Sequence, residues 1–142
     1  WEDEFVSIQE RYKRGVFALD TALFLHDLTD RTPHKFHMAF PYGYNTSSPK
    51  AAGILCSCKK EPYYSLGIAL VDTPAGNTVR AYNAEKTLCE ILKPISHTDI
   101  QIITDAFKRY AGRKDKNIPL LSEYAHQLRV EKRLRPYLEV LL

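Results

Sequence analysis

The sequence predicts an α+β fold, in which a small mixed or antiparallel sheet is packed with helices and followed by a C-terminal helical bundle. Before residue 83, short apolar runs are separated by Pro, Gly, Asn and Asp, which is typical of strands and turns. After it, apolar residues recur every three or four positions, which is typical of amphipathic helices. Hydrophobic residues make up 44% of the 142 and charged residues 26%, so a buried core is expected. We expect one compact unit with an α/β part (1–95) and a helical part (96–142).

Residues 83–92 predict the helix around which the rest of the chain is organised. Asn83 is a good N-cap, and Glu85 falls where the helix dipole favours a negative charge. One apolar stripe follows at helical spacing: Ala84, Leu88, Ile91 and Leu92. We expect the sheet and the C-terminal bundle to meet on this helix.

The N-terminal third predicts two helices and a strand. The first helix covers 2–12 and ends at Gly15, and the second covers 21–26 with Asp20 as its cap. After a turn at 28–33, polar and apolar residues alternate over 34–40. This alternation predicts a strand with Phe36, Met38 and Phe40 facing the core and Lys35, His37 and Ala39 facing away.

The middle of the chain predicts a loop, a second strand and a hairpin. Residues 41–49 are rich in helix and strand breakers and are expected to form the most mobile loop. A strand at 53–58 precedes one helical turn at 61–67. Two β-rich runs, 68–72 and 78–82, flank a five-residue loop with Pro and Gly, which favours a hairpin.

The last third predicts three helices. The first is capped by Ser96 or Thr98, and Gly112 ends it; its apolar stripe is Ile100, Ile103, Phe107 and Tyr110. Asn117 caps the second helix. The third runs from about Val130 to the end of the chain. Pro136 removes an intrahelical hydrogen bond, so either the helix starts near Leu134 or it kinks at Pro136, and we favour the kink.

Several classes of protein are disfavoured by composition. No apolar run approaches the roughly 18 residues that a membrane span needs, so no membrane association is expected. The three cysteines are an odd number without a secretion signal, which favours reduced thiols in the cytoplasm. The chain begins at Trp1 without an initiator Met, so we expect a fragment or a processed product.

Candidate catalytic and metal-binding patterns are weak. His34 and His37 point to opposite faces of a strand, and the other histidines have no ligand-type neighbours at useful spacing. There is no phosphate-binding glycine motif and no serine in a strand-to-helix elbow. The possible carboxyl pairs, Asp27 with Asp30 and Glu85 with Glu90, are more simply helix-end and surface charges. The sequence therefore predicts no enzyme, no cofactor and no metal site.

The excess positive charge lies in the last third. Residues 1–96 contain 11 Lys and Arg against 11 Asp and Glu, whereas residues 97–142 contain 9 against 6. The helix dipole explains cations at a helix end but not near a helix start. A patch that contacts phosphate or an acidic protein is one interpretation, and a solvated face is the other. The candidate residues are Lys108, Arg109, Arg113, Lys114, Lys116, Arg129, Lys132, Arg133 and Arg135.

Several segments, taken in order along nearly the whole chain, resemble the region after the winged helix in AbiEi-family antitoxins. These segments are Arg14–Phe17, Asp20–Asp30, Tyr42–Asn45, Asn77–Arg80, Glu85–Leu92 and Leu128–Lys132.

This resemblance implies a bacterial transcriptional regulator of an abortive-infection (phage-defence) operon, paired with a nucleotidyltransferase-type toxin. The domain that the chain resembles is associated with neutralising the toxin. Operator DNA is expected to be bound mainly by the winged helix, which these 142 residues do not contain. The family supplies no catalytic residues to transfer. The alternative is an accessory module that binds DNA non-specifically.

Overall fold

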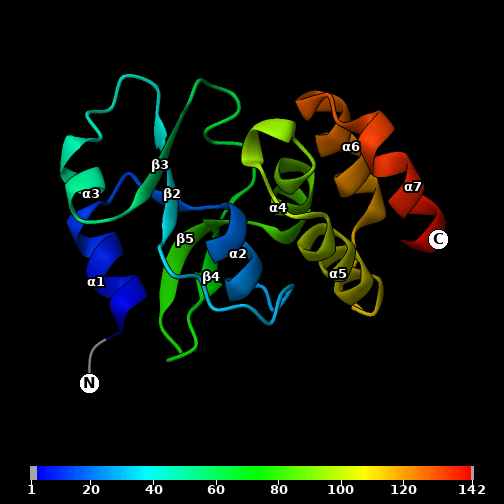
Figure 1. Cartoon of the computed structure of the whole chain (residues 1–142), viewed down its shortest axis with the longest axis horizontal. Helices are drawn as coiled ribbons and strands as arrows, with labels where there is room; N and C mark the ends of the chain where they lie inside the picture. The colour runs from blue at the N-terminus through cyan, green and yellow to red at the C-terminus, as the bar shows by residue number, and fades with distance from the viewer. Residues whose placement is uncertain (1–2, 142) are drawn as a thin grey trace.

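The structure, a computed structural model, describes residues 3–141 and places a sheet beside a group of helices (Figure 1). The helices are α1 (Glu4–Arg11), α2 (Leu19–Leu25), α3 (Ser47–Ala51), α4 (Ala84–Ile91), α5 (Ile100–Ala111), α6 (Ile118–Leu128) and α7 (Glu131–Leu141), with one 3-10 turn, η1 (Pro94–Ser96). The strands are β1 (Val16–Phe17), β2 (His37–Pro41), β3 (Leu55–Lys59), β4 (Ile68–Asp72) and β5 (Thr78–Tyr82). The predicted α+β fold is confirmed. None of the helices described is long and apolar enough to cross a membrane.

The sheet is mixed, with strand order β3-β2-β1-β5-β4. The predicted hairpin is confirmed as β4 and β5, which pair antiparallel with Val71 opposite Val79. Strand β1 joins the two halves of the sheet, because it pairs antiparallel with β2 and parallel with β5. The sequence did not predict β1, since two residues are too few to show an alternating pattern.

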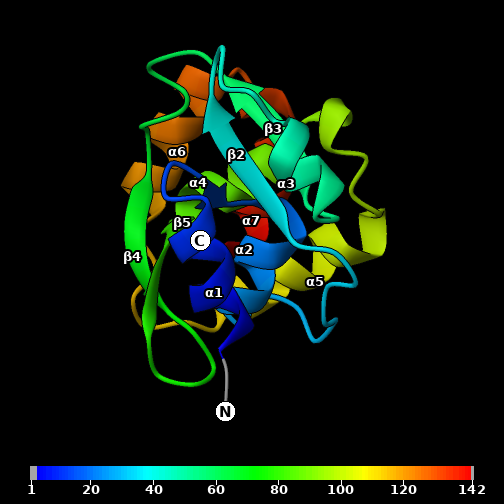
Figure 2. The ribbon, with the colours of Figure 1, turned by 90° about the vertical axis from the view of Figure 1, so that its left-hand side faces the viewer.

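Both faces of the sheet are covered. On one face, α1 lies across the strands, and the Phe5 ring contacts Phe17 edge-on at 5.5 Å (Figure 2). On the other face, Val16, Ala39 and Tyr82 are fully buried in a cluster with Ala18 and Tyr64. Ala39 was expected to face away from the core. That expectation was wrong, because a two-sided sheet buries both sets of alternating residues.

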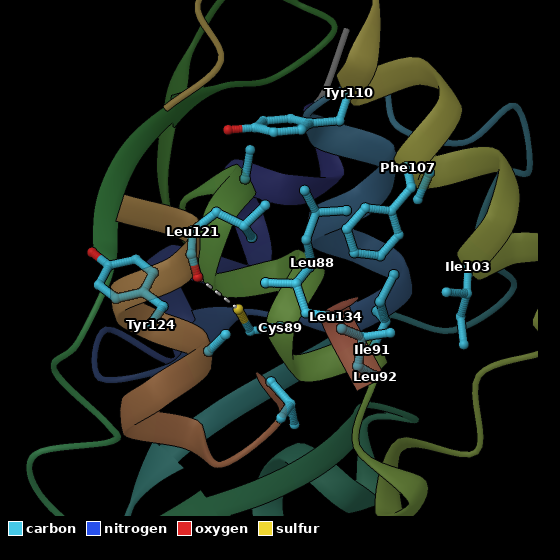
Figure 3. Packing of buried hydrophobic residues seen from close by; sticks show 14 of the residues in the cluster. Leu88, Cys89, Ile91, Leu92, Ile103, Phe107, Tyr110, Leu121, Tyr124 and Leu134 are labelled. Atoms are coloured by element: carbon cyan, nitrogen blue, oxygen red, sulfur yellow. Dashed lines mark hydrogen bonds between the residues drawn. The ribbon is translucent and has the colours of Figure 1, made fainter. Parts of the chain in front are cut away.

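The largest apolar core lies between α4 and the C-terminal helices. Leu88 and Ile91 of α4 pack against Phe107 of α5 and Leu121 of α6 (Figure 3). Leu23 of α2 belongs to the same cluster. The core therefore continues across residue 95 without interruption.

Several predicted ends of N-terminal elements were wrong. Helix α2 begins at Leu19 after Ala18, so Asp20 lies in its first turn and caps nothing. Helix α1 ends at Tyr12, whereas Gly15 lies where an added Cβ would be 2.5 Å from Met38 Cε. Gly15 therefore lies against the side chains of Met38 and Phe40 of β2 and does not act as a helix cap.

One prediction in the middle of the chain differs from the structure. The expected loop at 41–49 contains the start of α3, which buries Pro49. At 61–67, where one helical turn was expected, the chain forms hydrogen-bonded turns, and Leu66 N donates to Pro62 O at 3.0 Å with the spacing of a helical turn.

In the C-terminal third, Asp99 caps α5, in place of the predicted Ser96 or Thr98. The Ser96 hydroxyl instead donates to the carbonyls of Ile91 and Lys93. Ile100, predicted on the apolar stripe, is 64% exposed. Helix α5 ends at Gly112 and Asn117 caps α6, as predicted. Pro136 lies inside α7.

Candidate functional site

Helix α4 is buried along its whole length, although the sequence predicted one apolar stripe. All eight residues are less than 9% exposed, including the polar side chains of Glu85, Lys86, Thr87 and Glu90. A buried polar group is costly unless it finds a hydrogen-bond partner. The partners of these side chains therefore show whether α4 forms a reactive centre or a structural one.

Lys86 fastens the 61–67 segment to the helix. Its Nζ donates to the carbonyl oxygens of Tyr63 at 2.7 Å and Leu66 at 2.8 Å, and it lies 3.8 Å from the centre of the Tyr82 ring. Burial lowers the pKa of Lys86 to about 8, while the nearby Glu90 opposes that shift. The ammonium group is thus occupied by contacts within the chain.

Glu85 joins α4 to the start of α6 through one tyrosine. The Tyr110 hydroxyl donates to Glu85 Oε2 at 2.6 Å and accepts from the Asn117 N–H at 2.8 Å. Burial, followed by the hydrogen bond to Glu85, raises the pKa of Tyr110. The phenol therefore stays protonated and holds three helices together.

Glu90 lies at the far end of α4 and is joined to the sheet. Its Oε2 forms an ion pair with Lys59 Nζ of β3 at 2.6 Å. The other oxygen, Oε1, is buried and receives no hydrogen bond from any residue that the structure describes. The carboxyl pair proposed from sequence is thus divided, because Glu85 and Glu90 have different partners.

The histidines are distributed over the molecule. His26 Nε2 is 2.7 Å from Tyr82 O, and His37 Nε2 is 2.6 Å from Ser57 Oγ. Burial lowers the pKa of both imidazoles. Within residues 3–141, no group of three or more His, Cys, Asp or Glu side chains is placed to hold a metal ion.

The first group of predicted basic residues lies around the end of α5 and has mostly local partners. Arg109 pairs with Asp105 at 2.9 Å, and Lys116 donates to Ala111 O at 2.7 Å. Arg113 binds both oxygens of Asp115 at 2.8 Å. The remaining members, Lys108 and Lys114, are exposed. Most of this group therefore stabilises the end of α5 and the loop after it.

The second group lies where α6 turns into α7. Arg129 ends α6 in a left-handed conformation (φ 60°), and Lys132 and Arg133 lie in the first turn of α7. These three side chains, which we call the basic corner, line an open cavity of about 660 Å³. Glu131, the one acidic residue lining that cavity, is 3.1 Å from His126 Nδ1. Arg135, the last member of the predicted group, is exposed two residues after Arg133.

The two basic groups are separated by α6. The first lies before the N-terminus of α6 and the second after its C-terminus, and the helix has 11 residues. At 1.5 Å per residue the separation is roughly 16 Å. Figure 1 shows the end of α5 and the α6–α7 junction at opposite ends of α6. The structure does not bring the nine residues into one tight cluster.

No protein-family model matches the chain, and no curated protein matches it significantly.

The side chains of the basic corner are chemically suited to binding anionic groups. Cations near the N-terminus of α7 oppose the helix dipole, so their position has no stabilising explanation within the helix. Arg129 and Arg133 carry planar guanidinium groups, which bind carboxylates and phosphates through paired hydrogen bonds. The sequence identified these cations, but only the fold shows that they share one concave surface.

Proposed function

We propose that this chain is an antitoxin domain of the AbiEi kind, which neutralises a nucleotidyltransferase-type toxin by contact through the basic corner. The observation that supports this proposal is the gathering of Arg129, Lys132 and Arg133 on one open concave surface. An acidic surface on the toxin would complement their charge. The proposed antitoxin makes no covalent change to its partner, and it supports autoregulation of the operon.

The arrangement of the segments that carry the resemblance supports the same proposal. Asp20–Asp30 contains most of α2 and Glu85–Leu92 contains most of α4, and these helices pack together in the core. Leu128–Lys132 forms the turn that carries the basic corner. The resemblance therefore concerns both the frame of the domain and the surface that we assign to the partner.

Co-expression with the toxin encoded beside it tests the proposal. The full chain should restore growth and co-purify with the toxin. The triple variant Arg129→Glu, Lys132→Glu, Arg133→Glu should lose both effects, because charge reversal turns attraction into repulsion. The matched control is Lys108→Glu with Lys114→Glu, which alters two exposed cations elsewhere and should behave as wild type. A folded chain that neither binds the toxin nor restores growth contradicts the proposal.

The second candidate is an accessory module that binds DNA non-specifically, since the same cations can contact phosphate. Its affinity for a random duplex should fall steeply with salt, with a log–log slope near −3 if three cations contact phosphates. Under this second candidate, the variant Lys132→Glu, Arg133→Glu, Arg135→Glu should lose DNA binding and keep any antitoxin effect, whereas the first proposal expects that effect to be lost. A binding constant that does not change with salt removes this candidate.

A further inference from the structure

Strand β3 forms a free edge of the sheet, opposite β4 (Figure 2). The N–H of Leu55 donates to Phe36 O, and the carbonyl of Lys59 accepts from Tyr42 N, both at 2.9 Å. In a parallel pair, the backbone groups of alternate residues point to opposite sides of the strand. Those of Cys56 and Cys58 therefore point away from β2. This edge presents two N–H and two carbonyl groups at the spacing of a strand.

A groove of about 820 Å³ follows this edge. All five residues of β3 line it. The end of α3, the turn at Gly53 and the η1 segment also contribute to its lining. Leu55 and Ile95, two of the exposed large apolar side chains, are part of its lining and are 48% and 81% exposed. The groove therefore combines an unpaired strand edge with apolar contact area.

The charges around the groove favour an acidic occupant. Lys35, Lys50 and Lys93 line it from three separate segments, and none of them forms an ion pair within residues 3–141. Lysine on an edge strand can serve to prevent aggregation. That explanation suits Lys59 of β3, which is paired with Glu90, but not lysines that come from other elements.

Two carboxyl groups in the groove distinguish a peptide from a nucleic acid. Asp20 and Glu90 are both part of the lining, and they would repel a chain of phosphates. Every unit of a nucleic acid carries a phosphate, whereas a peptide can place uncharged residues beside these two carboxyl groups and acidic residues beside the lysines.

We propose that this groove binds an extended acidic segment of another protein, which pairs with β3 as a sixth strand. Main-chain hydrogen bonds to Cys56 and Cys58 supply affinity, and the lysines select acidic side chains. The inference does not depend on the antitoxin proposal, because the groove and the basic corner share no residue.

Selection of a displayed library of random twelve-residue peptides on the intact chain tests this proposal. The enriched peptides should be acidic with alternating apolar residues. A synthetic enriched peptide should bind in solution and shift the amide resonances of Cys56 and Cys58.

The deciding variant is Cys58→Pro, with Cys58→Ala as its control. Proline removes the outward N–H and blocks the edge without removing a hydrogen bond to β2. We expect Cys58→Pro to lower the affinity for the selected peptide about tenfold or more, and Cys58→Ala to change that affinity by less than about twofold. Lys50→Glu with Lys93→Glu should weaken it similarly, and Lys108→Glu with Lys114→Glu should not.

A second measurement keeps the test decisive if Cys58→Pro fails to fold. Two versions of the peptide are made, one methylated on its odd-numbered backbone nitrogens and one on its even-numbered ones. Only the version whose methylated nitrogens face β3 should fail to bind the wild-type chain. The proposal is overturned if no peptide is enriched, if the enriched peptides are not acidic, or if neither proline nor N-methylation weakens binding. A twelve-nucleotide thymidine strand that displaces the peptide would overturn it as well.

Discussion

Lys86 shows how a single residue can be both buried and charged in this protein. Its side chain is fully buried. The 61–67 segment can lie close to Lys86 because it ends in Gly67. Gly67 has a φ of +82°, and an added Cβ would lie 2.7 Å from Lys86 Cβ. Only glycine allows this backbone conformation and this distance together. The two carbonyl groups that Lys86 binds are thus brought to it by the glycine turn.

Lys86 should make stability depend on pH in the alkaline range. Between about pH 8 and its ordinary value of 10.5, the unfolded chain keeps the Lys86 proton and the folded chain releases it. Stability rises with pH wherever the unfolded state binds more protons. The free energy of unfolding of the wild type, minus that of Lys86→Met, should therefore become more positive across this range, by up to about 3 kcal/mol. Urea unfolding at several pH values measures it, and a constant or falling difference contradicts the assignment.

At the scale of elements, α4 is held by polar contacts at its two ends and by apolar contacts between them. At its start, Asn83 Oδ1 accepts from Lys86 N, which caps the helix as the sequence predicted. Glu85 reaches Tyr110, which also fixes the N-terminus of α6. At its end, Glu90 is paired with Lys59 of β3. Helix α4 therefore connects the sheet to the C-terminal helices through side chains of both kinds.

Tyr110→Phe should be strongly destabilising for its size. It removes one hydroxyl but leaves both the buried Glu85 carboxyl group and the Asn117 N–H without that partner, at a cost of about 3 kcal/mol. The matched control is Tyr124→Phe, because within residues 3–141 the Tyr124 hydroxyl has one partner, accepting from Asn83 Nδ2 at 3.3 Å. This control should cost less than about 1 kcal/mol. Chemical unfolding measures the loss of stability in both variants. Equal losses would contradict a bridging role for Tyr110.

For the whole molecule, the decisive feature is a core that includes both the α/β part and the helical part. Leu23 of α2 and Leu88 of α4 lie in the same apolar cluster as Phe107 and Leu134. Helix α4 packs against α2 of the α/β part and against α5 and α6 of the helical part (Figure 3). The two parts are therefore layers of one packing arrangement.

Residues 1–96 produced alone should not fold cooperatively. Removing α5–α7 exposes the apolar face of α4, including Leu88, Ile91 and Leu92, and each such side chain contributes about 1.5–3 kcal/mol when buried. We expect weak near-UV circular dichroism and no sharp thermal transition, whereas the full chain should show both. A fragment with a sharp transition and well-dispersed amide resonances would show that the parts fold independently.

Local chemistry was enough to predict much of this fold. The caps at Asn83 and Asn117 depend on a side chain and the backbone within three residues of it. The hairpin of β4 and β5 depends on a short loop between two β-rich runs. Asp20 shows the limit, because a good capping residue capped nothing once Ala18 took the position before α2.

The candidate surfaces divide in the same way. Two cations of the basic corner, Lys132 and Arg133, stand out in the sequence because they lie near a helix start, where the dipole disfavours positive charge. Arg129 ends α6, where the dipole favours a cation. The groove beside β3 could not be identified from the sequence, since Lys35, Lys50 and Lys93 come from segments that are far apart in the chain.

The sequence by itself determined which segments become helices or strands at most positions, because periodicity and capping act over a few residues. Only the tertiary structure decided that β1 joins the sheet, that α4 is buried on every side, and which side chains share a surface. These outcomes depend on contacts between distant residues, whose pairing leaves no local pattern in the chain.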